Sequence, residues 1–600
     1  MTAVCERTLA SGSVATRIVR RPVPAASDAR PHADALARRV LLARDVFEAD
    51  ELRFALADLP SPDTLPHIDA AVTRLLSARA DGERVLIVGD YDCDGATSTA
   101  VAVLGLRALG WSSVEHVVPN RFRDGYGLSP AIVATAIAAR APDLIVTVDN
   151  GVASVDGVAA ARANGVDVIV TDHHLPPETL PAAVAIVDPT LEGCTFPSRH
   201  LAGVGVIFYV LLALRAALAR RGDAAGGVNL AELLDLVAIG TVADVVPLDR
   251  VNRTLVEQGL RRIRAGRSRP GVLALLKAAG RDATRIASTD IGFALGPRLN
   301  AAGRLDDMAR GIACLLAETP AEATALATEL DALNTERRAV EGAMRADADR
   351  RLAESPALYA TSPGVASTVA SGEAFGVCLF DERWHQGVIG ILAGRLKERL
   401  HRPVVVLTAD GEADVKGSAR SIPGVHLRDV LQAIASRDPG LLARFGGHAM
   451  AAGMTFARDR LDDFTQAFDA EVRRVLDGRL PAREWLSDGP LGAGERTLES
   501  AALLARLMPW GQAFEAPQFD GEFEVITNRI VGAGHLKLTV APVDDAGRPD
   551  VGPLEAIAFG ETRLFDPGTR LTLLYALEVD RYRDRESLQL VVRYLEPLTG

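Results

Sequence analysis

Residues 85–95 read VLIVGDYDCDG, an apolar run that ends in three alternating aspartates and a glycine. A short apolar run bounded by a turn predicts a strand buried on both faces, as in a parallel sheet. Asp90, Asp92 and Asp94 would follow the carboxyl end of this strand, and the residues from 96 to 109 are helix-compatible. Ligands of open parallel sheets bind beyond the carboxyl ends of the strands. The stretch therefore predicts both the fold class and the position of the site.

The alternation of strands and helices continues to about residue 250. Further strand-like runs lie at 114–118, 144–148, 166–170 and 184–187. Apolar strands separated by helices predict an α/β domain with a parallel sheet, here residues 80–250. Acidic and histidine residues follow two of these runs and a predicted helix at 230–239: Asp149, Asp172, His173, His174 and Asp244.

These side chains point to a metal site. Because neighbouring strand ends meet at one edge of a sheet, we expect Asp92, Asp94, Asp149 and His173 to surround one pocket. Several carboxylates in one place repel one another, and divalent cations relieve that cost. A donor set of carboxylates with an imidazole suits Mn²⁺ or Mg²⁺, with two ions about 3.5–4 Å apart. Each feature alone could be a helix cap or a turn, but their coincidence favours a metal site.

The rest of the chain predicts three more regions. Residues 251–372 form a helical connector, whose long helix at 319–354 begins with a capping box (Thr319-Pro320-Ala321-Glu322) and is followed by a loop at 360–372. A second α/β domain spans 373–478, with strands at 377–380 and 404–407, a helix at 388–400 and two glycine-containing turns (GSARS, GGHAM). Residues 485–600 predict a small antiparallel barrel. We assign no role to residues 1–79, which match no motif.

The composition argues against several classes of protein. The net charge of −12 is inconsistent with coating nucleic acid by charge alone. No GxxxxGK[ST] loop is present, so an ATP-driven motor is not expected. The five cysteines form no CxxC pair, which indicates reduced thiols and a cytoplasmic protein.

Membrane association is not expected either. Residues 1–30 lack the apolar segment of a signal peptide and predict a flexible tail. Residues 201–219 are apolar and about long enough to span a bilayer, but Arg215 interrupts them and no comparable segment follows. We interpret this stretch as a buried core helix.

A resemblance extends this interpretation. Nine segments occur in the order seen in the RecJ single-strand exonucleases of the DHH phosphoesterase family, and together they cover most of residues 85–460. The triplet that names the DHH family is Asp172-His173-His174 here. The segments are GDYDCDGATSTA, NRFRDGYGLS, VTVDNG, VTDHH, GTVADVVPL, GPRLNAAGRL, WHQGVIGILAGRLKER, KGSARS and GGHAMAAGMT.

The resemblance implies roles for the clustered residues. Asp149 would bridge two ions and His174 would face the scissile phosphate, so both would be catalytic. Many relatives carry a histidine four residues before the first ligand aspartate, where this chain has Val88. The first ion would therefore be held more weakly, or water would complete its coordination. Asp90 would either ligate an ion or orient a neighbouring ligand. The implied metal ligands are Asp92, Asp94, Asp149, His173 and Asp244.

The resemblance also implies a path for DNA. The second α/β domain (DHH-associated) would bind the 5′ end, and the barrel, of OB type, would bind a single strand. For Arg298 and Arg304, a buried salt bridge is the competing interpretation. For the DHH-associated domain it is a solvated surface arginine or a turn glycine, and for the aromatic side chains it is burial in the core. The implied DNA-binding residues are Arg121, Tyr126, Arg298, Asn300, Arg304, Ser418, Arg420, Gly446, Gly447 and His448, with Trp510, Phe514, Phe519 and Tyr582 as stacking candidates.

The expected function is metal-dependent hydrolysis of single-stranded DNA from the 5′ end to 5′-mononucleotides, in recombination and repair. One alternative is a phosphodiesterase of short oligonucleotides or cyclic dinucleotides. Another is a non-catalytic scaffold with the DHH fold in a replication or repair complex. By family, a single-strand-binding protein, a helicase and mismatch-repair proteins are the expected partners of a monomer.

Overall fold

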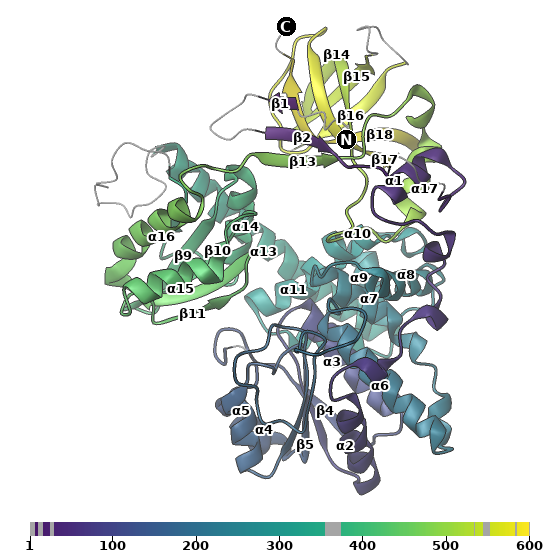
Figure 1. The fold of residues 1–600 in the computed structure, drawn as a ribbon, viewed down its shortest axis with the longest axis vertical. Helices are drawn as coiled ribbons and strands as arrows, with labels where there is room; N and C mark the ends of the chain where they lie inside the picture. The colour runs from purple at the N-terminus through teal and green to yellow at the C-terminus, as the bar shows by residue number, and fades with distance from the viewer. Residues whose placement is uncertain are drawn as a thin grey trace. The chain divides into compact units, whose positions relative to one another are not determined.

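The computed structural model describes residues 7–9, 16–24, 29–125, 127–354, 374–532, 534–543, 552–582 and 585–598. The chain forms two compact units (Figure 1). The first unit consists mainly of Arg20–Asn334 and Leu486–Gly600, and the second of Val4–Val19 and Thr335–Trp485.

A five-stranded sheet organises the first unit. All its neighbouring strands are parallel, in the order β4-β3-β5-β6-β7. The chain passes from β3 to β4 on one side and returns to β5 on the other, so the strand order reverses at β3 and β5. In doubly wound folds, this reversal creates the crevice in which ligands bind. The strands are β3 (Val85–Val88), β4 (Val114–Val117), β5 (Leu144–Val148), β6 (Asp167–Thr171) and β7 (Ala185–Val187).

Helices cover both faces of this sheet (Figure 1). The side chains of β3, β5 and β6 alternate between two apolar clusters, one with α4 (Pro130–Arg140) and α5 (Val155–Ala163), the other with α2 (Ile68–Asp81), α3 (Cys93–Ala108) and α6 (Gly203–Arg220). The prediction of a parallel α/β domain is confirmed. Because both faces are covered, every residue of β3 and β5 is buried.

The apolar stretch at 201–219 corresponds to α6. Within the described residues, α6 alone is long and apolar enough to cross a membrane, and 72% of its apolar window is buried inside the protein. It packs against α2, α3 and α7 (Leu234–Ala243). Its apolar character thus matches a central helix of the first unit.

A series of helices follows the sheet and ends in α13, which has 35 residues. Thr319 Oγ1 accepts a hydrogen bond from the backbone N–H of Glu322 at 3.3 Å, so the predicted cap and the helix bounds are confirmed. The helices are α7 (Leu234–Ala243), α8 (Arg250–Arg264), α9 (Pro270–Ala278), α10 (Ser288–Asp290), the π-helical η7 (Ile291–Leu295), α11 (Gly296–Leu305), α12 (Ala309–Leu316) and α13 (Pro320–Glu354). The predicted loop at 360–372 lies outside the described residues.

The second unit contains a mixed sheet in the order β11-β12-β10-β9-β8. The predicted GSARS turn is wrong, because residues 417–420 belong to strand β10. The predicted GGHAM turn is correct in part: Gly446 and Gly447 end strand β11, and residues 448–450 form the turn to β12. In β10, buried Val415, Gly417 and Ala419 alternate with half-buried Lys416, Ser418 and Arg420, which is the period of a strand. The elements are β8 (Val377–Phe380), α14 (Ile389–Leu400), β9 (Val404–Asp410), β10 (Asp414–Arg420), α15 (Leu427–Arg437), β11 (Arg444–Gly447), β12 (Ala451–Ala457) and α16 (Leu461–Val475).

The C-terminal region forms a closed barrel in the order β14-β15-β16-β18-β17. The predicted barrel is present, but it is not wholly antiparallel, because β16 and β18 pair in parallel. Phe519 is fully buried inside it, and Trp510 stacks on Phe514 with both rings buried. The prediction that these three rings stack on DNA is therefore wrong, because the core encloses them. The side chain of Tyr582 lies outside the described residues. The elements are α17 (Leu498–Leu507), β14 (Phe519–Val531), β15 (His535–Pro542), β16 (Leu554–Ala558), β17 (Arg570–Tyr582) and β18 (Arg585–Pro597).

The region before residue 80 is integrated into the fold. Leu36, Val40 and Leu41 of α1 (Ala35–Leu42) join the core of the first unit. β2 (Thr16–Arg20) lies between β1 (Arg7–Leu9) and β13 (Arg483–Ser487) in a small sheet, so the expected flexible tail is wrong for these segments. Short 3₁₀ turns join the larger elements: η1 (Ala49–Leu52), η2 (Leu56–Asp58), η3 (Pro62–Thr64), η4 (Ala224–Gly227), η5 (Leu230–Leu233), η6 (Ala283–Arg285), η8 (Arg458–Arg460) and η9 (Ala493–Glu495).

Candidate metal centre

The turn after β3 presents the first carboxylates. Asp92 caps α3, because its Oδ1 accepts a hydrogen bond from Gly95 N at 2.9 Å. A Cβ atom at Gly95 would lie 2.5 Å from the carbonyl oxygen of Asp90, so the turn requires glycine there. The capping interpretation of the aspartate pattern is thus correct for Asp92, but a cap uses only one of its two carboxylate oxygens.

Asp94 is held by the start of another helix. Its Oδ2 accepts a hydrogen bond from Gly203 N at 2.6 Å and its Oδ1 from Val204 N at 3.1 Å, both in the first turn of α6. The positive end of the helix dipole stabilises such a carboxylate. Gly240 of α7 also lies close, since a Cβ atom there would be 2.6 Å from Asp94 Oδ1. Asp94 therefore has a fixed position.

Left-handed backbone occurs at one further ligand candidate and directly after another. Asp149, directly after β5, has a φ of 61°, which aspartate tolerates better than most residues. Asp244 is the C-cap of α7, and the following Val245 has a φ of 63°, unfavourable for a β-branched side chain. Strained backbone of this kind is concentrated at functional sites.

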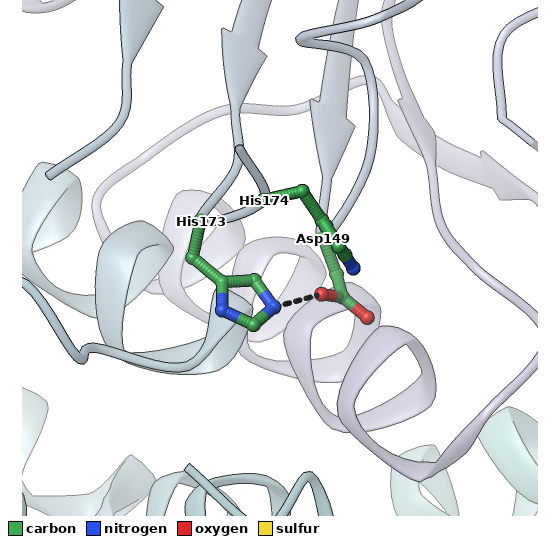
Figure 2. Close-up of side chains that lie close together, drawn as sticks. All are labelled: Asp149, His173 and His174. Carbon is green, nitrogen blue, oxygen red and sulfur yellow. Dashed lines mark ion pairs between the residues drawn. The ribbon is translucent and has the colours of Figure 1, made fainter. Parts of the chain in front are cut away.

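His173 joins these carboxylates. Its Nε2 lies 3.1 Å from Asp149 Oδ1, 3.5 Å from Asp244 Oδ2 and 4.0 Å from Asp94 Oδ2. Figure 2 shows the ring pointing at the Asp149 carboxylate. In the described part of the chain, the structure contains three groups of possible metal ligands, and within each group the ligand atoms lie within 4.8 Å of one another. The groups are Asp94–His173–Asp244, Asp90–Asp92–Asp149 and Asp149–His173–His174. The first two groups share no residue, but Asp149 of the second contacts His173 of the first, so Asp149 is placed where a bridging ligand would be.

Burial and mutual repulsion change the acidity of the cluster. Burial, followed by the charges of Asp94 and Asp92, raises the pKa of Asp149 well above its usual 3.8. Burial and Asp92 raise the pKa of Asp94 to about 7. Burial and neighbouring carboxylates likewise raise the pKa values of Asp90 and Asp244. Without cations, the protein therefore disfavours full ionisation of this cluster.

His174 has a different environment from His173. Its Nδ1 lies 2.7 Å from Asp172 Oδ1, and the same oxygen accepts hydrogen bonds from the backbone N–H groups of His173 and His174. Burial alone would lower the pKa of His174, but the hydrogen bond and charge of Asp172 outweigh it and raise the pKa to about 9. Sequence reasoning counted Asp172 only as part of a motif, whereas the structure shows that it orients both histidines.

The donor set fits divalent cations that prefer oxygen. Five carboxylates and two imidazoles converge, and no cysteine belongs to any of the three groups among the described residues. This composition suits Mn²⁺ or Mg²⁺ and does not suit thiolate-preferring metals. Val88, at the position of the family histidine, is fully buried in the apolar cluster beneath α4 and α5, so it adds no ligand.

The arginines and the asparagine predicted to contact DNA have distinct positions. Arg298 is 7% exposed and pairs with Asp331 Oδ1 at 2.8 Å, so the structure favours an internal role over a phosphate contact. Asn300 Oδ1 accepts a hydrogen bond from Cys93 N at 2.9 Å and thereby ties α11 to the aspartate turn. The guanidinium of Arg121 lies 4.8 Å from the ring centre of Tyr91, a contact that sequence reasoning missed. Arg304 is half-buried, and Tyr126 lies outside the described residues.

In the second unit, Ser418, Gly453 and Gly446 lie in one row across three strands. Ser418 of β10 pairs with Gly453 of β12, which pairs with Gly446 of β11. Arg420 Nη1 donates to Ser418 Oγ at 3.1 Å. A Cβ atom at Gly390, in the first turn of α14, would lie 2.9 Å from Ser418 Oγ and 3.0 Å from Arg420 Nη2. The strand surface here is bare backbone beside a hydroxyl and a guanidinium.

The two residues that follow Gly446 lead into the turn to β12. Gly447 has a φ of 144°, and a Cβ atom there would lie 2.4 Å from the carbonyl oxygen of Ala451. His448 is exposed, and its backbone N–H donates to Ala451 O at 2.8 Å. The tight turn from β11 to β12 therefore requires glycine at position 447.

Three family models match the chain: the DHH family N-terminal domain over residues 84–241, the DHHA1 domain over residues 368–474 and the RecJ OB domain over residues 487–594. The single-stranded-DNA-specific exonuclease RecJ of Dickeya dadantii is 48% identical over 98% of this chain and 100% of its own length. The chain belongs to the RecJ family.

Other relatives agree. RecJ of Escherichia coli is also 48% identical, over 96% of this chain and 99% of its own. The crystal structure of RecJ in complex with Mn²⁺ from Thermus thermophilus aligns with a TM-score of 0.75 at 29% identity, covering 94% of this chain and 76% of that one. The same RecJ in complex with Mg²⁺ aligns with a TM-score of 0.70. These structures support the expectation that RecJ proteins bind the ions that suit the donor set described above.

Proposed function

We propose that this protein is a metal-dependent exonuclease that hydrolyses single-stranded DNA from its 5′ end and releases 5′-mononucleotides. The observation that carries the proposal is the convergence of Asp94, Asp149, His173 and Asp244 beyond the strand ends. Membership of the RecJ family supports the substrate, since its relatives are named single-stranded-DNA-specific exonucleases.

The metal ligands would be Asp90, Asp92, Asp94, Asp149, His173 and Asp244. When bound, two divalent cations supply activation of the attacking water and neutralisation of the leaving oxygen. Asp149 lies adjacent to both ligand groups and would bridge them. Asp172 contacts the ring of His174 through Nδ1, and a ring nitrogen of His174 lies within 4.8 Å of ligand atoms of Asp149 and His173. From this position His174 would bind an oxygen of the scissile phosphate.

The second unit supports the polarity of the reaction. Ser418 and Arg420 would bind a terminal 5′-phosphate, with backbone N–H groups of Gly446 and Gly447 as further donors. The backbone N–H of His448 already donates to Ala451 O, so His448 would contribute through its side chain. Arginine suits this role because its guanidinium can make paired hydrogen bonds with phosphate oxygens. Arg121, Asn300 and Arg304 surround the aspartate turn and would order the strand near the metal centre.

The test compares end-labelled single strands in Mn²⁺ buffer with and without a chelator. A 5′-labelled strand should yield labelled mononucleotide from the earliest times, while a 3′-labelled strand shortens stepwise. Release of the 3′ label first would refute the polarity. Preference for dinucleotides or cyclic dinucleotides over long strands would favour a short-oligonucleotide phosphodiesterase, and strand binding without hydrolysis would favour a scaffold.

The proposed setting follows from the family. A monomer in the cytoplasm, acting in recombination and repair with a single-strand-binding protein, a helicase or mismatch-repair proteins, is consistent with this reaction. Analytical ultracentrifugation of the purified protein tests the monomer: a sedimentation mass near 63.5 kDa is expected, and twice that mass would contradict it.

A further inference from the structure

A buried carboxylate lies next to the catalytic loop but outside the proposed metal centre. Asp188 directly follows β7 and is fully buried. Its Oδ1 accepts a hydrogen bond from Thr190 N at 2.8 Å and lies 2.7 Å from Thr190 Oγ1. Among the described residues, its Oδ2 has no hydrogen-bond partner. A buried carboxylate oxygen without a hydrogen bond lowers the stability of the fold, so its presence calls for an explanation.

Thr190 connects Asp188 to His174. The hydroxyl of Thr190 donates to the backbone carbonyl oxygen of His174 at 2.9 Å. On the other side of the same residue, Asp172 accepts the backbone N–H of His174 at 3.1 Å and contacts its ring Nδ1 at 2.7 Å. The peptide groups on both sides of His174 are therefore held by hydrogen bonds from different strand ends.

Proton counting indicates the state of Asp188. The carbonyl of His174 can only accept, so the single hydroxyl proton of Thr190 serves that bond. The 2.7 Å contact between Thr190 Oγ1 and Asp188 Oδ1 is then a hydrogen bond if Asp188 donates. Burial, followed by the charge of Asp172, raises the pKa of Asp188 to about 7, so the protonated form is well populated up to about neutral pH.

We propose that Asp188 and Thr190 are positioning residues that fix His174 against the scissile phosphate. We call the contacts of the Thr190 hydroxyl with Asp188 and with the His174 carbonyl the Thr190 bridge. The proposal rests on the proposed role of His174. Without the Thr190 bridge, the backbone at His174 keeps only its hydrogen bond to Asp172, and the imidazole ring moves away from the position it needs for the reaction. A shift of about 1 Å in a catalytic group can lower a rate by about 100-fold.

Two substitutions of Thr190 separate positioning from stability. Thr190→Val keeps the side-chain shape but removes the hydroxyl, and we expect kcat on a 5′-phosphorylated single strand to fall about 10- to 100-fold with KM within about twofold. Thr190→Ser keeps the hydroxyl but removes the methyl group, and we expect a lower melting temperature with kcat within about twofold of the wild type. A purely structural Thr190 would instead make kcat follow the melting temperature in both variants, which would overturn the proposal.

The Asp188 side chain gives a second test. Asp188→Ala removes the partner of Thr190 and should lower kcat as Thr190→Val does, whereas Asp188→Asn keeps an uncharged polar group and should restore at least a third of wild-type kcat. Asp143→Ala is the matched control, because Asp143 lies before β5 at the opposite edge of the sheet and pairs with Arg84. Equal kcat in Asp188→Ala and the wild type would overturn the proposal.

His174→Ala distinguishes the bridge from the proposed function. If His174→Ala abolishes hydrolysis while Thr190→Val does not affect it, the Thr190 bridge is wrong and the proposed function stands. If His174→Ala is fully active, the role of His174 is wrong, and the bridge loses its purpose.

Discussion

His173 Nε2 and Asp149 Oδ1 lie 3.1 Å apart, although one residue follows β6 and the other follows β5. The contact is possible because the two strands are parallel neighbours whose carboxyl ends meet. Five carboxylates, Asp149 among them, lie at this site, and burial raises the pKa values of four, Asp90, Asp94, Asp149 and Asp244. This arrangement is stable in its ionised form only with a compensating positive charge.

Asp149→Ala should abolish hydrolysis while single-strand binding persists. Asp149 is adjacent to both ligand groups, so its loss removes the proposed bridge and should lower kcat by more than about 1,000-fold, as removal of an essential catalytic group does. Hydrolysis of a labelled strand and fluorescence anisotropy measure the two properties. Asp143→Ala should retain wild-type activity. Appreciable activity in Asp149→Ala would contradict the bridging assignment.

The metal-free protein should lose stability as pH rises. The folded-state pKa values of the clustered aspartates lie above 3.8, and that of Asp94 is about 7. At pH values between the unfolded and folded pKa values, the folded protein therefore binds more protons than the unfolded chain. The contribution of these groups to the free energy of unfolding is full below about pH 4 and decreases as pH rises to about 7 and beyond. Melting temperatures in chelator should be lower at pH 8 than at pH 6.

Manganese should reverse this loss. Ions that bind the folded state stabilise it by mass action. The increase in melting temperature on adding Mn²⁺ at pH 8 should be smaller in Asp149→Asn than in the wild type, while Asp149→Asn in chelator should melt higher than the wild type. Identical melting curves of the wild type with Mn²⁺ and with chelator would contradict this account.

Gly203→Ala should inactivate the enzyme, whereas Gly205→Ala should not. A Cβ atom at Gly203 would lie 2.6 Å from Asp149 Cβ and 2.8 Å from its Cα, so the ligand would have to move. At Gly205, two residues along the same helix, the nearest atom is the flexible end of Leu201 at 3.3 Å. Activity titrated with Mn²⁺ measures the difference. Equal activity of the two variants would show that the position of Asp149 is not critical.

Arg44→Ala should destabilise the first unit. Arg44 pairs with Asp488 at 2.6 Å, and the two side chains are 3% and 2% exposed. Removal of one partner from a buried pair costs about 3–5 kcal/mol. The exposed pair of Arg53 and Asp50 is the control, and Arg53→Ala should cost at most about 1 kcal/mol. Thermal melting distinguishes the two, and equal shifts would contradict the importance of burial.

The core of the proposed site was predictable because it follows from topology. Asp92, Asp94, Asp149 and His173 follow strands that an apolar pattern identifies, and parallel strands place those ends together. The roles of Asp172 and the Thr190 bridge depend on which oxygen faces which backbone group. Neither strand pattern nor spacing contains that information.

Other errors have the same origin. Ser418 and Gly446 were assigned to turns because serine and glycine favour turns, but pairing with β12 makes their segments strands. The burial of Arg298 and Trp510 depends on contacts with Asp331 and Arg44, which lie in other segments of the chain. An arginine or an aromatic residue in a strip of sequence has the same appearance whether it binds DNA or fills the core.

The most direct test is anomalous diffraction at the manganese edge from crystals grown with Mn²⁺. We predict one or two peaks within bonding distance of Asp94, Asp149, His173 and Asp244, and loss of at least one peak in Asp149→Ala. A map with no peak among these side chains, from crystals of an active protein, would contradict the metal centre.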